Sequence, residues 1–380
     1  MGLSERIITT PEIYLGTLKP ENPVFFFSPA ILQETANLFL DGFPGLVTYA
    51  VKSNPSEAVL VNLVSAGLRG FDVASVEEIQ QIRAISSEVA LHFNNPVRSR
   101  SEITASLGYN VASYSVDCAT ELEKLIEIVP SDGIEIAVRF KLPVAGAAYN
   151  FGSKFGADPK TAVTLLNRVV EAGFIPALTF HPGTQCTSPD AWVRYIEAAA
   201  EIAKEAGVKI ARLNVGGGFP SYRVSCERPE LGRIFKAIGD TTARVFGDDA
   251  PALICEPGRA MVAESYTLAA QVKAVRPDGS VFLNDGIYGA LAELPSIGAI
   301  DRISVVDPAG DIRTGAAIGR TVFGPTCDSI DCLPGATPLP EDIAEGDYVL
   351  FEGLGAYSVP TATRFNGFGD HRIVTVDRFQ

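Results

Sequence analysis

The sequence predicts a (β/α)8 barrel of the TIM type, followed by a C-terminal all-β domain that is sandwich-like or barrel-like. Between about residues 25 and 262, short apolar segments typical of strands alternate eight times with longer segments of helical period. After residue 262, strand-like segments continue with almost no helical period. The length of 380 residues is sufficient for both parts. We therefore expect a barrel domain at 25–262 and a β domain formed by 1–24 and 263–380.

The first part of the chain supplies the eight strands of the predicted barrel. They are "VTYAVK", "GFDVAS", "VALHFN", "VASYSVD", "IEIAVRF", "PALTFHPG", "RLNVGGG" and "ALICEPG". The segments between them, such as "DPKTAVTLLNRVVEAGF", often begin at Ser, Asp or Pro and end at Gly, as helices do. A doubly wound open sheet would show a similar alternation. Eight strands, and no GxGxxG motif in the first unit, favour the barrel.

The second part reads as a sheet domain. Its strand-like segments are "YTLAAQVKAV", "SVFLNDGIY", "RISVVD", "AAIGRTVFG", "DYVLFEG" and "RIVTVDRF", separated by Gly, Pro and Asp turns. The N-terminal segments "IYLG" and "PVFFFS" are expected to add a strand to this domain.

The composition restricts the partners of the protein. It is 47% hydrophobic and 20% charged, which is typical of a packed, folded chain. The net charge of −14 argues against nucleic acid or an anionic membrane as partner and permits a cationic ligand. No signal peptide or membrane-spanning run is visible. The six cysteines show no CxxC pair and no partnered histidine, so no metal site is predicted and a reducing, cytoplasmic location is expected.

Polar residues end several of the predicted barrel strands, and the carboxyl ends of such strands form the active sites of barrel enzymes. In chain order these residues are Lys52, Asp72, Arg139, His181, Gly216, Gly217, Gly218, Glu256 and Arg259. Each alone has an ordinary structural explanation, such as a lysine that reaches solvent or a glycine that turns the chain. Their convergence on one rim favours a functional site.

These residue types suit one cofactor. The "NVGGGFP" turn can offer backbone N–H groups to a phosphate, and Arg259 adds a charged donor. Glu256 can hold a proton on a pyridine-type nitrogen, and His181 can present a flat face to an aromatic ring. Lys52 can form an imine with an aldehyde. Phosphate, pyridine and aldehyde are the three binding features of pyridoxal 5'-phosphate.

Seven ordered motifs resemble those of one enzyme family. The motifs "YAVKSN", "FDVASVEEI", "LNVGGGFP", "EPGRAMV", "NDGIYG", "GPTCDSID" and "EGLGAYS" look like those of the fold-type III pyridoxal-phosphate decarboxylases that act on ornithine, lysine and diaminopimelate. The resemblance extends from about residue 25 to "RFNGFG". The motifs "GPTCDSID" and "FNGFG" favour the ornithine/lysine branch.

The resemblance implies roles for individual residues. Lys52 would bind the cofactor covalently, with Asp72 in its hydrogen-bond network and Arg139 and Glu78 in a second line. His181 would stack on the ring, and Glu256 would pair with the ring nitrogen. The phosphate would be held by Gly216, Gly217, Gly218, Arg259, Tyr357 and Thr184, the last standing where the family more often has serine.

The β domain would contribute further residues by the same resemblance. Tyr288 would lie close to the cofactor, and Cys327 and Asp328 would enter the partner's barrel across a head-to-tail homodimer interface. Cys327 would return a proton to the substrate Cα. The alternative for Cys327 is a buried apolar cysteine, and for Tyr357 a core or interface tyrosine.

The reaction that the resemblance implies is α-decarboxylation of an amino acid, which gives an amine and CO2. Ornithine and lysine decarboxylases usually have an aspartate eight or nine residues after the tyrosine, where this chain has Ser296. Either Asp328 holds the distal ammonium of a basic substrate, with Glu293 close in sequence, or the substrate is a non-basic or otherwise specialised amino acid. A racemase is disfavoured because such enzymes place arginine against the ring nitrogen. An inactive regulatory homologue is disfavoured because Lys52 and Cys327 are intact.

Overall fold

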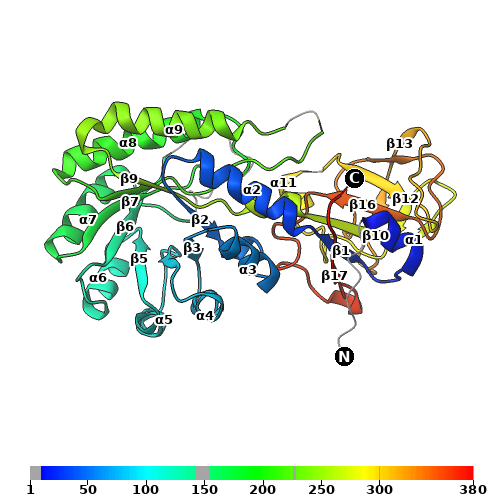
Figure 1. Ribbon diagram of the computed structural model, residues 1–380, viewed down its shortest axis with the longest axis horizontal. Coiled ribbons are helices and arrows are strands. Elements are labelled where there is room, and N and C mark those ends of the chain that lie inside the picture. The colour runs from blue at the N-terminus through cyan, green and yellow to red at the C-terminus, as the bar shows by residue number, and fades with distance from the viewer. Residues whose placement is uncertain (1–9, 143–153, 226–227, 299, 380) are drawn as a thin grey trace. The chain divides into compact units, whose positions relative to one another are not determined.

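The computed structural model describes residues 10–142, 154–225, 228–298 and 300–379. The chain forms two compact units (Figure 1). The barrel unit comprises Ala36–Pro220 and Pro229–Ala260, and the β unit comprises Met1–Thr35, Ser221–Arg228 and Met261–Gln380. The predicted domain boundaries remain a prediction, because compactness does not establish which segment folds alone.

Eight parallel strands close the barrel in sequence order. The ring is completed where β2 pairs with β9, with Leu46 opposite Ile254. This closure confirms the predicted barrel and excludes the open sheet. The strands are β2 (Leu46–Ala50), β3 (Gly70–Val73), β4 (Ala90–Phe93), β5 (Val111–Val116), β6 (Glu135–Arg139), β7 (Ile175–Thr179), β8 (Arg212–Asn214) and β9 (Ala252–Cys255).

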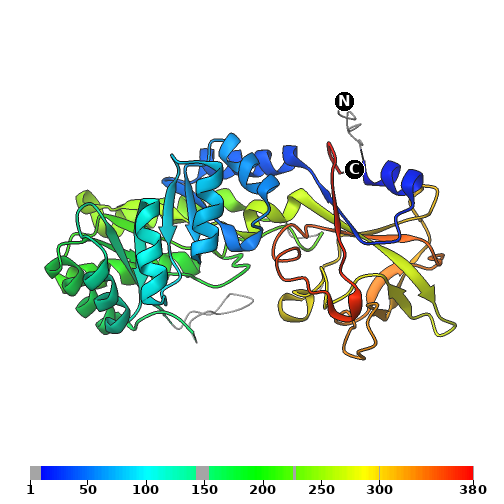
Figure 2. The same cartoon turned by 90° about the horizontal axis from the view of Figure 1, so that it is seen from below.

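Helices lie outside the barrel strands (Figures 1 and 2). The chain reaches β2 through α2 (Pro29–Gly42), and α10 (Arg259–Val262) follows β9. The helices between the strands are α3 (Glu57–Ser65), α4 (Val76–Ile85), α5 (Arg100–Ser106), α6 (Ala119–Ile128), α7 (Pro159–Glu171), α8 (Asp190–Ala206) and α9 (Leu231–Phe246).

Local sequence signals fix several of these helix ends. The Ser75 side chain accepts from the backbone of Glu78 at the start of α4, and Ser99 and Glu102 form a capping box at α5. Gly207 ends α8 in the left-handed conformation that glycine adopts without strain. These caps place the helix boundaries, and therefore the strand ends, close to the positions that the sequence predicts.

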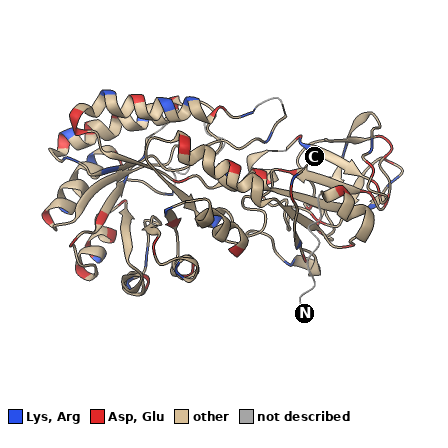
Figure 3. Ribbon diagram, viewed as in Figure 1, with Lys and Arg blue, Asp and Glu red and all other residues tan. Residues whose placement is uncertain are grey.

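Charged residues of both signs lie along the outer helices (Figure 3). Both signs occur together on α8 and α9, as the Arg244–Glu197 contact of 2.7 Å and the Lys236–Asp240 contact of 2.6 Å illustrate. In the described part of the chain, no helix combines the length and apolar character of a membrane span. Nor do the described residues include three or more His, Cys, Asp or Glu side chains grouped to hold a metal ion.

The β unit is built around one long strand, β10 (Tyr266–Val275), which pairs with β1, β11 and β16. The main sheet has the order β12-β16-β10-β1-β17, with β11 and β14 joined at one side, and β13 and β15 form a separate pair. The other strands are β1 (Val24–Phe27), β11 (Val281–Leu283), β12 (Ile303–Val306), β13 (Ala317–Arg320), β14 (Val322–Phe323), β15 (Thr337–Pro340), β16 (Tyr348–Glu352) and β17 (Arg372–Thr375).

The N-terminal expectation is half right. The segment "PVFFFS" forms β1 and pairs with β10 and β17, as predicted. The segment "IYLG" was predicted as strand and is wrong, because it lies in helix α1 (Pro11–Leu18). Pro11 begins this helix, and the buried Tyr14 packs edge-on against Phe26 at 5.4 Å between ring centroids. Its apolar residues therefore cover the sheet without joining it.

Candidate active site

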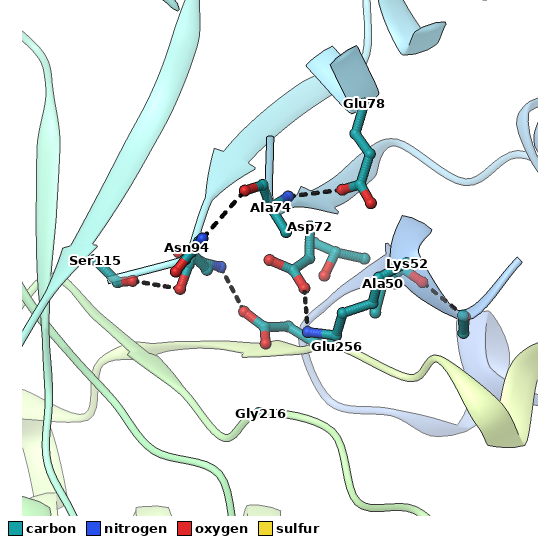
Figure 4. A network of polar contacts seen from close by, with 12 residues as sticks. Ala50, Lys52, Asp72, Ala74, Glu78, Asn94, Ser115, Gly216 and Glu256 are labelled. Atoms are coloured by element: carbon teal, nitrogen blue, oxygen red, sulfur yellow. Dashed lines mark hydrogen bonds and ion pairs between the residues drawn. The ribbon is translucent and has the colours of Figure 1, made fainter. Parts of the chain in front are cut away.

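Lys52 lies just beyond β2, in a single 3₁₀ turn formed by Val51–Ser53. The turn is fixed because the Ser53 hydroxyl donates to the Ala50 carbonyl at 2.7 Å. The Lys52 ammonium lies 3.5 Å from Asp72 Oδ2 at the end of β3 (Figure 4). The Asp72 side chain is only 4% exposed, whereas Lys52 is 49% exposed. A buried carboxylate therefore holds an amine that a ligand can reach.

Glu78, in the first turn of α4, lies beside this pair (Figure 4). Its Oε2 accepts the Ala74 backbone N–H at 2.7 Å. Burial raises the pKa of Glu78 to about 7; the Ala74 bond opposes this rise and the Asp72 carboxylate adds to it. Glu78, which the family resemblance assigns to a second line of active-site residues, thus lies next to Lys52 and Asp72.

Glu256 follows β9 and is buried. Burial and the nearby Asp72 raise its pKa to about 7, while Lys52, a bond from Asn214 and Arg139 oppose the rise. Its Oε1 accepts side-chain N–H groups from both Asn94 and Asn214. Glu256 Oε2 has no hydrogen-bond partner among the residues that the structure describes, so this oxygen is available to a ligand N–H.

Asn94 and Asn214 were missed by sequence reasoning. Both are polar residues at the carboxyl ends of predicted strands, in "VALHFN" and "RLNVGGG". Their position on the rim was the available signal. That signal is weak for an amide, because amides are ordinary at strand ends.

His181 follows β7. The contacts of its ring indicate which nitrogen carries the hydrogen. Its Nδ1 accepts the Gly183 backbone N–H at 3.1 Å, so the ring hydrogen is on Nε2. Burial lowers the pKa of His181 well below its usual value, and Arg139 and Lys52 lower it further. The imidazole is therefore uncharged at neutral pH and can stack on an electron-poor ring.

Arg139 ends β6 and adds a partly buried cation. Burial lowers its pKa, and the Glu256, Asp117 and Asp72 carboxylates oppose that decrease. Its guanidinium lies 5.3 Å from the centre of the Phe155 ring. The structure thus places Arg139 with the carboxylates at the strand ends, as predicted.

The glycine turn after β8 has no room for side chains. A Cβ at Gly216 would lie 2.2 Å from the Phe180 carbonyl oxygen, and one at Gly218 would lie 2.4 Å from that of Gly183. Both glycines also have positive φ, 67° and 84°. The Gly216 N–H donates to Asn214 Oδ1 at 2.9 Å, so the amides of Gly217 and Gly218 are the candidates for a ligand.

Two further predicted phosphate ligands belong to the barrel unit. Thr184 is partly buried and lies one residue after Gly183, close in sequence to the bond from Cys186 N to the Gly218 carbonyl at 2.9 Å. Arg259 begins α10 and is 7% exposed. Its guanidinium is a charge-assisted donor of the kind that binds phosphate.

The residues present in the barrel unit fit pyridoxal 5'-phosphate. Glu256 Oε2 can accept from a protonated ring nitrogen, the neutral His181 can face the ring, and the Lys52 amine can meet an aldehyde. The closely packed glycine turn is suited to a phosphate because only backbone can lie there. The observed geometry and the residue types agree with this one cofactor.

The β unit brings a second set of predicted residues together. The Tyr288 hydroxyl donates to Asp328 Oδ2 at 2.6 Å, which lowers the pKa of Asp328. The neighbouring Cys327 thiol donates to Asn366 Oδ1 at 3.4 Å, and its backbone N–H donates to the same oxygen. Phe365 lies against the Tyr288 ring, 4.8 Å between centroids. Cys327 is exposed, which excludes the buried-cysteine alternative within this chain.

Asp331 organises these loops and was not predicted. It is 1% exposed and accepts the Ile287 N–H at 3.0 Å. Its other oxygen accepts the Thr326 N–H at 3.1 Å and the Thr326 hydroxyl at 2.7 Å. One carboxylate thus joins the loop that carries Tyr288 to the loop that carries Cys327.

Two further predicted residues belong to the β unit. Ser296 lies in α11 (Leu294–Ile297), is exposed, and donates to the Glu293 carbonyl at 3.0 Å. Tyr357 is partly buried and has a left-handed backbone, with φ of 58°.

Comparison with known proteins agrees with this site. Residues 31–263 match the model of the pyridoxal-binding domain of pyridoxal-dependent decarboxylases. The chain is 30% identical to mouse (Mus musculus) ornithine decarboxylase over 344 residues, 84% of this chain and 73% of that protein. It is 31% identical to a lysine/ornithine decarboxylase of Selenomonas ruminantium over 330 residues, 85% of this chain and 81% of that protein.

The fold is also shared with solved structures. The arginine decarboxylase of Paramecium bursaria Chlorella virus, in its complex with agmatine, superposes with a TM-score of 0.85 at 25% identity, over 95% of this chain and 98% of that one. The chain belongs to the pyridoxal-dependent decarboxylase family, in the fold-type III group and its ornithine/lysine branch. It is a carboxy-lyase that uses pyridoxal 5'-phosphate.

Proposed function

We propose that this enzyme removes the α-carboxylate of a basic amino acid, ornithine or lysine, and releases CO2 and a diamine. The observation that carries the proposal is the grouping of Lys52, Asp72, Glu256 and the neutral His181 at the carboxyl ends of the barrel strands. The two relatives named above support the basic substrate class by their own activities. The acidic chain, with a net charge of −14, favours a cationic substrate.

Each site residue has its own role in the proposed reaction. Bound pyridoxal 5'-phosphate supplies an electron sink that accepts the electron pair left when CO2 departs. Lys52 would hold the cofactor through its amine, and Asp72, 3.5 Å from that amine, would keep it in position. Glu256 Oε2 retains the proton at the ring nitrogen. Cys327 then delivers a proton to the substrate Cα from its thiol.

The β-unit residues act in a second copy of the chain under this proposal. Cys327 is exposed, and Ile330, three residues further, is 63% exposed. Catalytic and apolar groups that face solvent in one chain support a homodimer in which they complete a partner's barrel site. A cytoplasmic location accords with five described cysteines that are free thiols.

Ser296 favours one alternative substrate. No carboxylate stands at this position, and its hydroxyl is bonded to the Glu293 carbonyl within α11. A buried distal ammonium without a charged partner would typically cost several kcal/mol. If Asp328 does not supply that partner, the natural substrate has a shorter or neutral side chain.

A substrate panel tests the proposal. CO2 release should be fastest with ornithine or lysine and slower with arginine, diaminopimelate and neutral analogues. Ser296→Asp should raise activity on ornithine or lysine, and Asp328→Ala should lower it. Unchanged activity in Ser296→Asp, with complete loss in Asp328→Ala, would assign the distal ammonium to Asp328 alone. Racemisation without CO2 release, or protein that stays colourless with the cofactor, would overturn the proposed reaction.

A further inference from the structure

Two amide side chains converge on one oxygen of the buried Glu256. Asn94 follows β4 and Asn214 ends β8, so the two residues reach Glu256 from separate strands of the barrel. Figure 4 shows Asn94 beside Glu256. Both Nδ2 atoms donate to Oε1, which leaves Oε2 with no hydrogen-bond partner among the described residues. One carboxylate oxygen is therefore doubly bound and the other is open.

The orientation of the Asn214 amide is determined by its other contact. Its Oδ1 accepts the Gly216 backbone N–H at 2.9 Å, which fixes the oxygen on that side and turns Nδ2 toward Glu256. Asn214 therefore joins the Glu256 carboxylate to the glycine turn. Substitution by aspartate would keep the acceptor for Gly216 and replace the donor to Glu256 by a second carboxylate oxygen.

The Asn94 amide is oriented by Glu256 itself. Its main-chain carbonyl accepts the Ser115 hydroxyl at 2.7 Å, which holds the backbone (Figure 4). Its side-chain Oδ1 is buried and has no hydrogen-bond partner among the described residues. The reversed amide would direct this oxygen at a carboxylate, which is repulsive, so Nδ2 faces Glu256.

These donors oppose the effects that would protonate Glu256. The charged groups that face Glu256 are Asp72 from β3, Lys52 from the turn after β2, and Arg139 from β6. Burial and Asp72 favour the neutral carboxyl, whereas N–H donors favour the carboxylate. A neutral carboxyl could not hold a proton on a ring nitrogen, so the donors matter for cofactor binding.

We propose that Asn94 and Asn214 are positioning residues that clamp Oε1 of Glu256, so that Oε2 is presented as an acceptor to the protonated ring nitrogen of pyridoxal 5'-phosphate. The inference rests on the proposed role of Glu256 and concerns cofactor binding, whatever the substrate is. It adds two amides to the chemical recognition of the ring.

The test measures affinity for pyridoxal 5'-phosphate, by equilibrium titration of the full-length apoprotein across pH. Asn214→Asp should weaken binding about ten-fold or more at pH 8, because a bond to a charged group is lost. The loss of affinity for the cofactor should become smaller towards pH 6, because the introduced carboxyl and Glu256 can then share a proton. A loss of equal size at both pH values would indicate a merely structural role and overturn the proposal.

A double-mutant cycle tests whether the amides act through Glu256. Asn94→Ala should weaken cofactor binding in the natural protein and have no further effect in a Glu256→Ala background. Equal effects in both backgrounds would overturn the proposal. Asn62→Asp is the matched control, because its amide donates to the Ala58 carbonyl in an exposed helix contact. Its affinity for the cofactor should match that of the natural protein.

The outcomes separate this inference from the proposed substrate. Natural protein that binds the cofactor but fails to decarboxylate ornithine or lysine would refute the substrate and leave the clamp standing. Should Asn214→Asp fail to fold, the Asn94→Ala cycle still decides the question, since Asn94 makes no bond to the glycine turn. Cofactor binding unchanged in both single variants would refute the clamp and leave the reaction untouched.

Discussion

The two units carry their predicted catalytic residues in opposite environments. At the barrel strand ends, Asp72 and Glu256 are buried among fixed partners, and the pKa of Glu256 is raised to about 7. In the β unit, Cys327 is exposed and Asp328 has a lowered pKa caused chiefly by its bond from Tyr288. Burial tunes acidity in the barrel, whereas the β unit holds its groups in place without removing them from water. The barrel site is therefore suited to a cofactor, whereas Cys327 of the β unit stays exposed.

Removal of the barrel amine should have the largest effect. Lys52→Ala should abolish the absorbance of the covalently held cofactor and reduce decarboxylation on the order of 10⁴-fold or more, because this variant has no amine to bind the aldehyde or to return after the reaction. Absorbance spectra and CO2 release measure the two effects. Lys236→Ala, which removes a 75% exposed lysine from α9, should leave both unchanged. A coloured, active Lys52→Ala protein would show that the barrel unit is not the unit that binds the cofactor through this lysine.

Loss of the β-unit thiol should have a smaller effect of a different kind. Cys327→Ala should slow product formation on the order of 10²-fold and divert the proton from the substrate Cα to another atom, because the thiol that would donate a proton to Cα is then missing. Product analysis in D2O measures both changes. Cys332→Ala, whose thiol only donates to the Leu333 carbonyl, is the control and should retain normal products. Cofactor absorbance should persist in both variants, which places the thiol's role after cofactor binding.

The sequence predicted the barrel well because each strand is an apolar run bounded by helices with clear end signals. β6, for example, has buried Ile136 and Val138, and Asp158 caps the helix that follows. The signals fail where apolar residues have two uses. The residues "IYLG" carry apolar side chains that suit either a strand or the buried face of a helix, and only Pro11 indicated the helix. β15 was missed because its sequence, "TPLP", contains two prolines.

The charged site residues were predictable, whereas their supports were not. Lys52, Asp72 and Glu256 are costly to bury and so stand out in apolar strands. Asn94 and Asn214 are ordinary at strand ends, and their shared bond to Glu256 depends on how β4, β8 and β9 are registered in the closed ring. Asp331 resembles a turn residue in "DSID", and its links to Ile287 and Thr326 join residues far apart in sequence.

Asp331, which joins the loops that carry Tyr288 and Cys327, should affect stability separately from the catalytic reaction. Asp331→Ala should destabilise the protein by about 2–3 kcal/mol, because two backbone N–H groups lose a charged acceptor in a buried place. Urea denaturation of the full chain measures this. Asp342→Ala removes a 46% exposed carboxylate that lies 3.8 Å from Arg313, and it should cost no more than about 0.5 kcal/mol. Equal costs for the two variants would show that burial does not distinguish Asp331.

The effect of Glu78 on stability depends on pH and has a defined sign. The pKa of Glu78 in the folded chain is about 7, above the ordinary value of 4.5. The folded state therefore binds the proton more tightly, so Glu78 lowers stability as pH rises from about 4.5 to 7, and the loss is complete above that range. Glu78→Gln keeps an acceptor for the Ala74 N–H and removes the charge.

The Glu78→Gln apoprotein should be more stable than the natural apoprotein at pH 8, by at most about 3 kcal/mol, and equal to it near pH 4.5. Urea denaturation at both pH values measures the difference. Glu77→Gln is the control, because its exposed neighbouring carboxylate should change neither value. A Glu78→Gln gain that is the same at both pH values would show that packing, and not proton binding, sets the effect. A gain confined to high pH would establish that the barrel unit loses stability by keeping a carboxyl with a pKa near 7 beside Lys52. The partly buried Asp328 of the β unit, whose pKa is lowered, carries no such cost.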